Sequence, residues 1–421
     1  MRFSPRLLLF PLFLGVPPRA TLDAQRSAAS SPPRALSPVI PVSVRWNRLV
    51  PRFVEEAASS RRAARAAAKG DSAVLRRIAQ APPPFLFRVF SVLSVAQYAA
   101  VTSAAEGRTA STAVAIAGAS AVVLSEFFTD STVRASIARE LERDIETARA
   151  GVRSPDAANV GRRLGEDAAR RVLAWVPPFI MIAPFNGTIP KGPGMWTSAP
   201  GIPPIGTAMA TSRGWLLDSA AQFRPAPPPA YGSPAFDAAI EEVRRIARTR
   251  TPEQTRIAQK WNNGDPMVSW NEAASAAILR HGMADVDAVR VLALLNVGAS
   301  DAAIACFDAK YHYWTIRPSQ ADTTLVLADS VGLPNFPSYP SGHACTAGAF
   351  DAILGHFFPT ERAEFTRVAQ EQAMSRLYGG IHYRFDNDGG LALGRIVAAY
   401  DLEREQRGAL KGLRNAAASK P

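Results

Sequence analysis

The sequence predicts an all-α protein. Three observations lead to this prediction: apolar residues recur at helical spacing along most of the chain, good helix formers such as Ala and Arg are abundant, and the strict alternation typical of β-strands is scarce. The chain has 421 residues, of which 47% are hydrophobic and 20% are charged. This composition is ordinary for a globular protein with a large buried core.

The N-terminal segment departs from the helical pattern. Arg2 and Arg6 precede an apolar run over residues 7–16, and a Pro-broken polar stretch follows, which is typical of a secretory signal peptide. We therefore expect a signal peptide over residues 1–24 and a disordered Pro-rich leader over residues 25–41. The apolar run has only half of the roughly 20 residues that a membrane span needs. Export to the periplasm or the extracellular space is favoured over a membrane anchor.

A single helical domain is predicted over residues 42–410. It consists of a helical half at 42–175, a Pro/Gly-rich excursion at 176–234 and a second helical half at 235–410. Helices are predicted at 53–68, 85–104, 109–125, 133–150, 160–175, 235–247, 253–261, 268–281, 286–309, 344–358, 360–374 and 389–405. The segment 109–125 has no charge but is weakly hydrophobic and rich in small residues. We assign it to the core rather than to a membrane.

Charge and cysteine content exclude several classes of protein. The net charge is +12, but no basic cluster with interleaved aromatic residues is present, so nucleic acid is not an expected partner. The charge instead indicates a bias towards anionic substrates or surfaces. Only Cys306 and Cys345 are present, which excludes a disulfide framework and a multi-cysteine metal site. A single bridge and two buried thiols both fit the sequence, and the second is slightly favoured.

The stretch FPSYPSGHACTAG, at residues 336–348, places a turn directly before a helix. Pro340, Ser341 and Gly342 resist helix continuation, while small helix-forming residues follow. We expect Ser341 to cap this helix and His343 to lie in its first turn. Unpaired backbone N–H groups and the positive end of the helix dipole make such a turn a natural anion site. Taken alone, however, the stretch fits an ordinary capped helix better.

Two further segments contain unusual polar residues. KYHYWTIRP holds Lys310 and Arg317, whose separation of seven residues is about two helical turns and predicts that both project from one side of a helix. SRLYGGIHYRFD holds Arg376, followed by His382 and Asp386. Asp386 would lie one turn beyond His382 on the same face if helix continues there. Each of these residues, taken singly, is more often structural.

Together these residue types suit one chemistry. Two guanidinium groups, one ammonium group, a serine hydroxyl and a backbone amide form a set of donors that matches a tetrahedral oxyanion. His382 is then a candidate nucleophile or ligand, and His343 is available for proton transfer. Asp386 would orient the His382 ring or raise its basicity.

The order and spacing of the three segments resemble a known signature. Lys-x6-Arg-Pro, Pro-Ser-Gly-His and Ser-Arg-x5-His-x3-Asp are similar to the three-part signature of the vanadium-dependent haloperoxidases and the type 2 phosphatidic acid phosphatase superfamily, and the flanking residues look like those of soluble bacterial haloperoxidase-like proteins. The resemblance implies an all-helical fold built around two four-helix bundles. It also implies that vanadate or phosphate is bound by Lys310, Arg317, Ser341, Gly342, His343, Arg376 and His382.

Two chemistries follow from this resemblance. In the haloperoxidase interpretation, His382 is the ligand to the vanadium of bound vanadate, Lys310 polarises hydrogen peroxide and His343 acts as acid and base. A halide is oxidised to a hypohalous-acid equivalent that reacts with a small organic substrate. In the phosphatase interpretation, His382 attacks phosphorus to form a phosphohistidine, and His343 protonates the leaving alcohol.

Length favours the haloperoxidase interpretation. The chain lacks the several membrane spans usual in lipid phosphatases of this superfamily, and small soluble acid phosphatases are shorter. A soluble exported acid phosphatase is the alternative. An exported oxyanion-binding protein is less favoured, because it would need neither His343 nor the pair of His382 and Asp386. Halide preference, the native organic substrate and the oligomeric state stay open.

Overall fold

The computed structural model describes residues 40–68, 85–106, 110–151, 155–176, 181 and 183–416. The predicted signal peptide (1–24) and all but the last two residues of the predicted leader (25–41) lie outside the described residues, so both stay predictions. The described chain is helical, which confirms the predicted fold class. Within these ranges, strand-type pairing is limited to one isolated antiparallel bridge between Met195 and Thr315.

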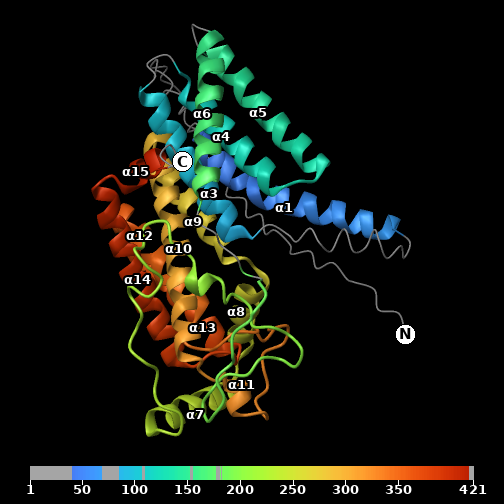
Figure 1. The fold of residues 1–421 in the computed structure, drawn as a ribbon, viewed down its shortest axis with the longest axis vertical. Helices are drawn as coiled ribbons and strands as arrows, with labels where there is room; N and C mark the ends of the chain where they lie inside the picture. Colours follow the sequence, from blue (N-terminus) through green and yellow to red (C-terminus); the bar gives the residue numbers. More distant parts are fainter. Residues whose placement is uncertain are drawn as a thin grey trace, which may run out of the picture. The chain divides into compact units, whose positions relative to one another are not determined.

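The first half of the chain forms one group of packed helices (Figure 1). Its members are α1 (Val42–Ala67), α3 (Leu86–Glu106), α4 (Thr112–Phe127), α5 (Ser131–Gly151) and α6 (Pro155–Trp175). The α4 and α6 backbones approach closely, because a Cβ at Gly165 would stand 1.9 Å from the Ala115 carbonyl oxygen. Glycine at this α6 position therefore allows the two helices to pack closely. The buried residues of α4 confirm the predicted core position of this segment.

The second half forms the other group. Its helices are α7 (Pro234–Thr249), α8 (Pro252–Asn263), α9 (Pro266–Arg280), α10 (Asp285–Tyr313), α11 (Pro318–Ala321), α12 (Gly342–Phe357), α13 (Arg362–Tyr378), α14 (Arg384–Gln406) and α15 (Ala409–Ala416). Helices α10, α12, α13 and α14 pack against one another, and α10 also packs against α3. The arrangement agrees with the two four-helix bundles that the resemblance implies.

Several helix starts carry the local signals that made them predictable. Helices α7, α8 and α9 each begin with a proline, and each is preceded by a capping residue whose side chain accepts a backbone N–H: Ser233, Thr251 and Asp265. Thr251 forms a full capping box with Gln254. Because the cap stands before the first periodic apolar residue, the predicted starts fall one or two residues late.

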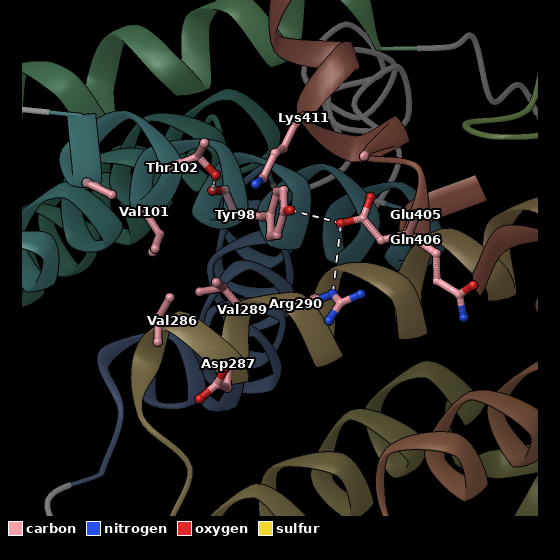
Figure 2. Close-up of a pocket in the computed structure, with 12 residues that line it drawn as sticks. Tyr98, Val101, Thr102, Val286, Asp287, Val289, Arg290, Glu405, Gln406 and Lys411 are labelled. Atoms are coloured by element: carbon pink, nitrogen blue, oxygen red, sulfur yellow. Dashed lines mark hydrogen bonds and ion pairs between the residues drawn. The ribbon is translucent and has the colours of Figure 1, made fainter. Parts of the chain in front are cut away.

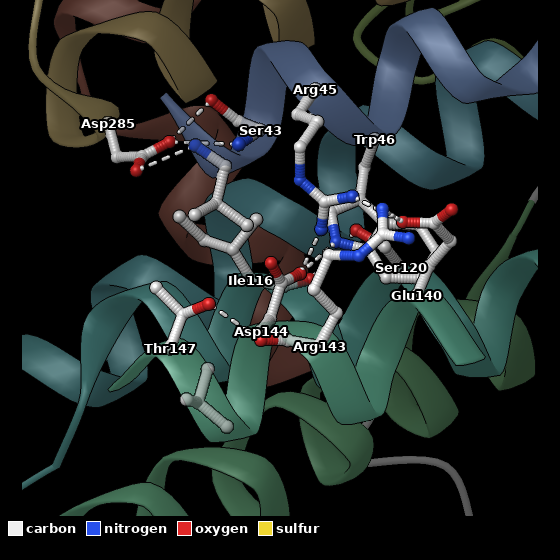
Figure 3. Close-up of polar contacts among 12 residues, drawn as sticks. Ser43, Arg45, Trp46, Ile116, Ser120, Glu140, Arg143, Asp144, Thr147 and Asp285 are labelled. Carbon is white, nitrogen blue, oxygen red and sulfur yellow. Dashed lines mark hydrogen bonds and ion pairs between the residues drawn. The ribbon is translucent and has the colours of Figure 1, made fainter. Parts of the chain in front are cut away.

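Helix α1 begins earlier than the predicted 53, at Val42, and runs through Pro51. Tertiary contacts outweigh the loss of one backbone hydrogen bond at the proline. Figure 3 shows the start of α1 held by acidic side chains from other helices. Asp285 accepts hydrogen bonds from the Ser43 backbone and hydroxyl at 2.9 and 2.7 Å, and the Trp46 indole donates to Asp144 at 2.8 Å.

The Pro/Gly-rich excursion is an ordered loop with one short 3₁₀ turn, Met209–Thr211, over the part that the structure describes. It is fixed to α10 by two acidic residues. The Asp301 carboxylate accepts hydrogen bonds from the backbone N–H groups of residues 215–217 at 2.7–3.2 Å. The Asp308 carboxylate accepts hydrogen bonds from Arg224 Nε and Nη2 at 2.8 and 2.9 Å. These contacts hold the loop beside the second helical half.

Two described helices, α3 and α10, are long and apolar enough to span a membrane by length and composition. The relevant windows are 78% and 94% buried inside the protein, respectively. Their apolar side chains therefore form the shared core of the two helical groups.

Candidate active site

The Pro-Ser-Gly-His turn stands at the start of α12. Gly342 is the first residue of the helix and His343 lies in its first turn, as predicted. Ser341 is the N-cap residue, but its hydroxyl makes no capping hydrogen bond, so the predicted side-chain cap is wrong. The Ser341 N–H instead donates to the Asp386 carbonyl at 2.9 Å, and the buried hydroxyl has no partner in the protein. Apart from its chain neighbours and the backbone of its own helix, no heavy atom lies within 4 Å of the position that a Cβ would take at Gly342.

Lys310 and Arg317 do not share a helix, contrary to the prediction. Helix α10 ends at Tyr313, because Trp314 adopts a left-handed conformation (φ 49°), and Arg317 lies beyond it at the start of α11. Both side chains nevertheless reach the same loop. The Lys310 ammonium donates to the carbonyls of Pro337, Ser338 and Pro340 at 2.9, 2.8 and 2.5 Å. Its three N–H donors are thereby used within the protein.

Arg317 keeps one donor free. Its Nε donates to the Phe336 carbonyl at 2.9 Å and its Nη1 to the Ile381 carbonyl at 2.7 Å, next to His382. Its buried Nη2 has no partner. Arg376, from α13, is anchored by the Ser375 hydroxyl at 3.0 Å and by the Ala258 carbonyl at 3.1 Å.

His382 precedes α14 rather than lying on it, because the helix begins at Arg384. Asp386, in the first turn, still meets the ring: its Oδ2 accepts from His382 Nδ1 at 2.8 Å, from the Ser338 hydroxyl at 2.6 Å and from the Tyr383 N–H at 3.0 Å. Since a carboxylate accepts, Nδ1 carries the proton and Nε2 presents a lone pair. The predicted orienting role of Asp386 agrees with this geometry, although the predicted shared helix face does not.

His343 is held by groups that the sequence did not indicate. Its Nε2 lies 3.0 Å from the Trp261 carbonyl, which can only accept, so Nε2 carries the proton and Nδ1 is the acceptor. Gln372 donates to the His343 carbonyl at 2.9 Å and is itself fixed by the Trp270 indole at 2.6 Å. Ser338, Gln372 and the Trp261 carbonyl were missed because buried polar partners far apart in sequence leave no local pattern.

The site concentrates positive charge away from water. Lys310 and Arg317 are fully buried and Arg376 is 3% exposed. Among the described residues, none of the three forms an ion pair. Burial lowers the pKa of Lys310 to about 8 and the pKa values of both arginines to about 10. Buried charges are normally paired with an opposite charge, so this cluster of cations favours the binding of an anion.

The pKa values of the candidate acid–base groups are shifted as well. Burial, reinforced by the charge of Arg376, lowers the pKa of His343 to about 3, so the ring is neutral at pH 7. Burial, with Arg317 and Lys310, also lowers the pKa of His382. Burial raises the pKa of Asp386 to about 6, against the hydrogen bond from Ser338. The contact between His382 and Asp386 is therefore a hydrogen bond between a neutral ring and a carboxylate.

An apolar cavity of about 170 Å³ borders the turn. Its lining residues are Phe85, Phe87, Met181, Met209, Pro266, Ala303, Cys306, Phe307, Phe336, Gly342, His343 and Thr346. The Phe336 ring separates cavity and cations, with its centre 5.0 Å from Lys310 Nζ and 5.1 Å from Arg317 Cζ. Met181 and Met209 come from the Pro/Gly-rich excursion, which thus contributes to the rim of the site.

A larger cavity of about 430 Å³ lies elsewhere, between α3, α10 and the end of α14 (Figure 2). None of the predicted site residues lines it. Glu405 accepts the Tyr98 hydroxyl there at 2.8 Å and the Leu410 N–H at 2.8 Å, so its carboxylate is already used in fixing the start of α15. Its buried polar groups serve packing rather than a ligand.

Comparison with known proteins supports the assignment of this region. Residues 290–403 match the model of the PAP2 superfamily. This part of the chain is thus similar to a PAP2 superfamily domain. The matched residues include every predicted site residue, from Lys310 to Asp386.

Curated relatives of this PAP2 domain fall into two groups. The chain is 31% identical over 115 residues to a vanadium-dependent bromoperoxidase from Ascophyllum nodosum, a match covering 20% of this chain and 21% of that relative. It is 44% identical over 59 residues to a lipid A 1-phosphatase from Rhizobium etli, covering 14% of this chain and 25% of that relative. The chain thus matches a quarter or less of the length of these relatives. The superfamily contains haloperoxidases and phosphatases.

Solved structures share the fold over a much longer stretch. A bacterial vanadium-dependent iodoperoxidase is similar with a TM-score of 0.63 and 24% identity, over 76% of this chain and 91% of that chain. A bacterial vanadium-dependent chloroperoxidase is similar with a TM-score of 0.61 and 14% identity, over 77% of this chain and 92% of that chain. These likenesses establish the common helical fold.

Proposed function

We propose that the protein is an exported vanadate-dependent haloperoxidase that uses hydrogen peroxide to oxidise a halide to a hypohalous-acid equivalent, which then acts on a small organic substrate. The observation that carries the proposal is a buried, unpaired cation cluster that borders an aromatic cavity. The cluster favours an oxyanion, and the cavity favours chemistry on a weakly hydrated halide or an apolar molecule.

The residues fit vanadate. Arg317 Nη2 and the Ser341 hydroxyl are buried donors without a partner, and open space lies over Gly342. His382 Nε2 is the unprotonated ring nitrogen suited to be a ligand. No group of three or more His, Cys, Asp and Glu side chains gathers among the described residues. The donor set therefore suits an oxyanion held by cations and one histidine rather than a bare cation.

Vanadate bound here would supply a Lewis-acidic centre that activates hydrogen peroxide towards a halide. The chain's residues have separate tasks. Arg317, Ser341 and the first N–H groups of α12 bind the oxyanion oxygens, and Lys310 and Arg376 add uncompensated charge. Neutral His343 offers Nδ1 as the acceptor for a proton from hydrogen peroxide, and its lowered pKa keeps that nitrogen unprotonated at pH 7. The aromatic cavity limits water beside the reacting oxygen.

The fold supports the haloperoxidase over the phosphatase. Similarity to haloperoxidase structures extends over 76–77% of the chain, whereas the phosphatase match is confined to 59 residues. Phosphate-monoester hydrolysis is the second candidate, because that shorter match reaches 44% identity. It would use His382 as nucleophile and would need a protonated His343.

The test is a paired assay of purified protein, with and without orthovanadate. One arm follows peroxide-dependent halogenation of a dye with chloride, bromide and iodide in turn, and the other follows p-nitrophenyl phosphate hydrolysis. Halogenation that requires vanadate is expected. Phosphatase activity inhibited by vanadate, without halogenation of any halide, would overturn the proposal in favour of the second candidate.

Two alanine variants sharpen this assay. His382→Ala removes the ring nitrogen with the free lone pair and should abolish vanadate-dependent activity. His356→Ala is the matched control, since His356 is an exposed histidine near the far end of α12. It should retain wild-type activity. N-terminal sequencing of secreted material would check the proposed removal of residues 1–24.

A further inference from the structure

Two cysteine side chains meet beside the anion site without a role in the proposed mechanism. Cys306 comes from α10 and Cys345 from the first turn of α12, and both are fully buried free thiols. Both thiols belong to one buried cluster where α10 packs against α12, and each shifts the pKa of the other. They are the only cysteines in the chain. The packing of the two helices thus brings together two thiols that are 39 positions apart in sequence.

The surroundings of Cys306 tie it to the site. Its Sγ lies 3.6 Å from the Pro340 carbonyl, which also accepts Lys310 Nζ at 2.5 Å. Cys306 precedes Lys310 by one helical turn. Burial raises the pKa of the Cys306 thiol, but the neighbouring Cys345 thiol and the charge of Lys310 outweigh this effect, so the net pKa is lowered. Burial and the Cys306 contact raise the pKa of Cys345.

An apolar cavity borders one of the two thiols. Cys306 lines the apolar cavity of about 170 Å³ together with Gly342 and His343, whereas Cys345 is not among the lining residues. Hydrogen peroxide is little larger than water, which occupies roughly 30 Å³ in the liquid. Peroxide that enters this cavity would therefore lie next to Cys306 rather than next to Cys345.

We infer that Cys306 and Cys345 form a peroxide-responsive dithiol, in which Cys306 is the attacking thiol and Cys345 the resolving one, and that oxidation joins α10 to α12 by a disulfide. Cys306 sulfur attacks one peroxide oxygen, the O–O bond breaks, and the departing hydroxide takes up the thiol proton to leave water and a sulfenic acid. Cys345 sulfur then displaces the sulfenic oxygen, which leaves as a second water. The two thiols are oxidised together by two electrons, and peroxide is reduced to two waters.

The experiment needs neither vanadate nor halide, so its outcome is independent of the proposed halogenation. Full-length protein purified under reducing conditions is freed of reductant, treated with increasing hydrogen peroxide, denatured in iodoacetamide and digested for mass spectrometry. We expect a peptide that links Cys306 to Cys345, with loss of both alkylated cysteines in parallel. A protein isolated already bridged, and reopened by reductant, supports the same site.

Single variants separate the two thiols. In Cys345→Ala, Cys306 lacks its resolving partner and should accumulate sulfenic acid that dimedone traps. In Cys306→Ala, Cys345 should stay reduced over the same peroxide range. Two results would refute the inference: wild-type Cys306 that oxidises to sulfonic acid with no bridged peptide, or both cysteines staying fully alkylatable after a free-thiol control is consumed.

Discussion

The Ser341 hydroxyl gives the sharpest test of the oxyanion site, because its effects on stability and on binding should have opposite signs. The hydroxyl is fully buried and has no hydrogen-bond partner in the protein. It does not cap α12. A Ser341→Ala substitution therefore removes no hydrogen bond from the anion-free protein, yet removes one donor from the site.

The magnitudes follow from these contacts. A buried hydroxyl without a partner costs about 1–3 kcal/mol, so the anion-free Ser341→Ala protein should be as stable as wild type or more stable, by up to about 1 kcal/mol after the loss of side-chain packing. A hydrogen bond from the hydroxyl to a charged oxyanion contributes about 1.5–3 kcal/mol. Vanadate should consequently bind the variant about 10- to 150-fold more weakly.

Ser338→Ala is the matched control, since Ser338 is a fully buried serine three residues earlier whose hydroxyl donates to Asp386 at 2.6 Å. It should lose about 2 kcal/mol of unfolding free energy, because a charge-assisted hydrogen bond disappears. Calorimetric titration with orthovanadate measures affinity, and urea unfolding without anion measures stability. The reasoning fails if Ser341→Ala binds vanadate as tightly as wild type, or if it is destabilised as much as the control.

Three other substitutions test the charges of the site and core. Burial lowers the pKa of Lys310 from its ordinary 10.5 to about 8, so between these two pH values the unfolded chain binds more protons than the folded one. The free energy of unfolding should therefore rise with pH across this window, by about 3 kcal/mol more than in Lys310→Met. Urea unfolding at a series of pH values would measure this difference. Asp386→Asn keeps an acceptor for His382 but removes the charge, and vanadate affinity measured by calorimetry should fall about tenfold. Burial and the nearby Asp301 raise the pKa of Asp401, whose carboxylate oxygens are buried without partners. The folded protein therefore favours the protonated carboxyl of Asp401, and the stability that depends on this proton is lost as pH rises through the folded pKa. Asp401→Asn, which is neutral at every pH, should raise the melting temperature at pH 8 but not at pH 4.

Much of the fold could be predicted from the sequence. Helical periodicity located the long helices, but the Ser-Pro, Thr-Pro and Asp-Pro pairs at the starts of α7, α8 and α9 were not used, so those starts were predicted one or two residues late. The short helices α11 and α15 were missed, since four to eight residues carry too little periodicity. The path of Arg317 was also missed. Trp314 ends α10 in a left-handed conformation that non-glycine residues rarely adopt, and no sequence pattern announces it.

The candidate site was predictable as a set of residues rather than as a geometry. Spacing within each segment identified Lys310, Arg317 and His382, but their distances depend on how α10, α12 and α14 pack. That packing relies on close approaches that only glycine permits: a Cβ at Gly394 would stand 1.9 Å from the Cys345 carbonyl oxygen. The aromatic cavity draws residues from several distant parts of the chain, so local patterns could not reveal it.

The way the buried cations are held explains how the site keeps its charge. Lys310 is satisfied by three backbone carbonyls, and Arg317 and Arg376 are anchored mainly by carbonyls as well. A carbonyl satisfies an N–H donor without cancelling its formal charge, whereas a carboxylate would do both. The carboxylate of Asp386, which accepts from His382, Ser338 and a backbone N–H, offsets only part of the charge of the three cations. The fold thereby satisfies the hydrogen bonds of the cations while keeping a net positive field, and in a low-dielectric pocket that field favours an oxyanion over water.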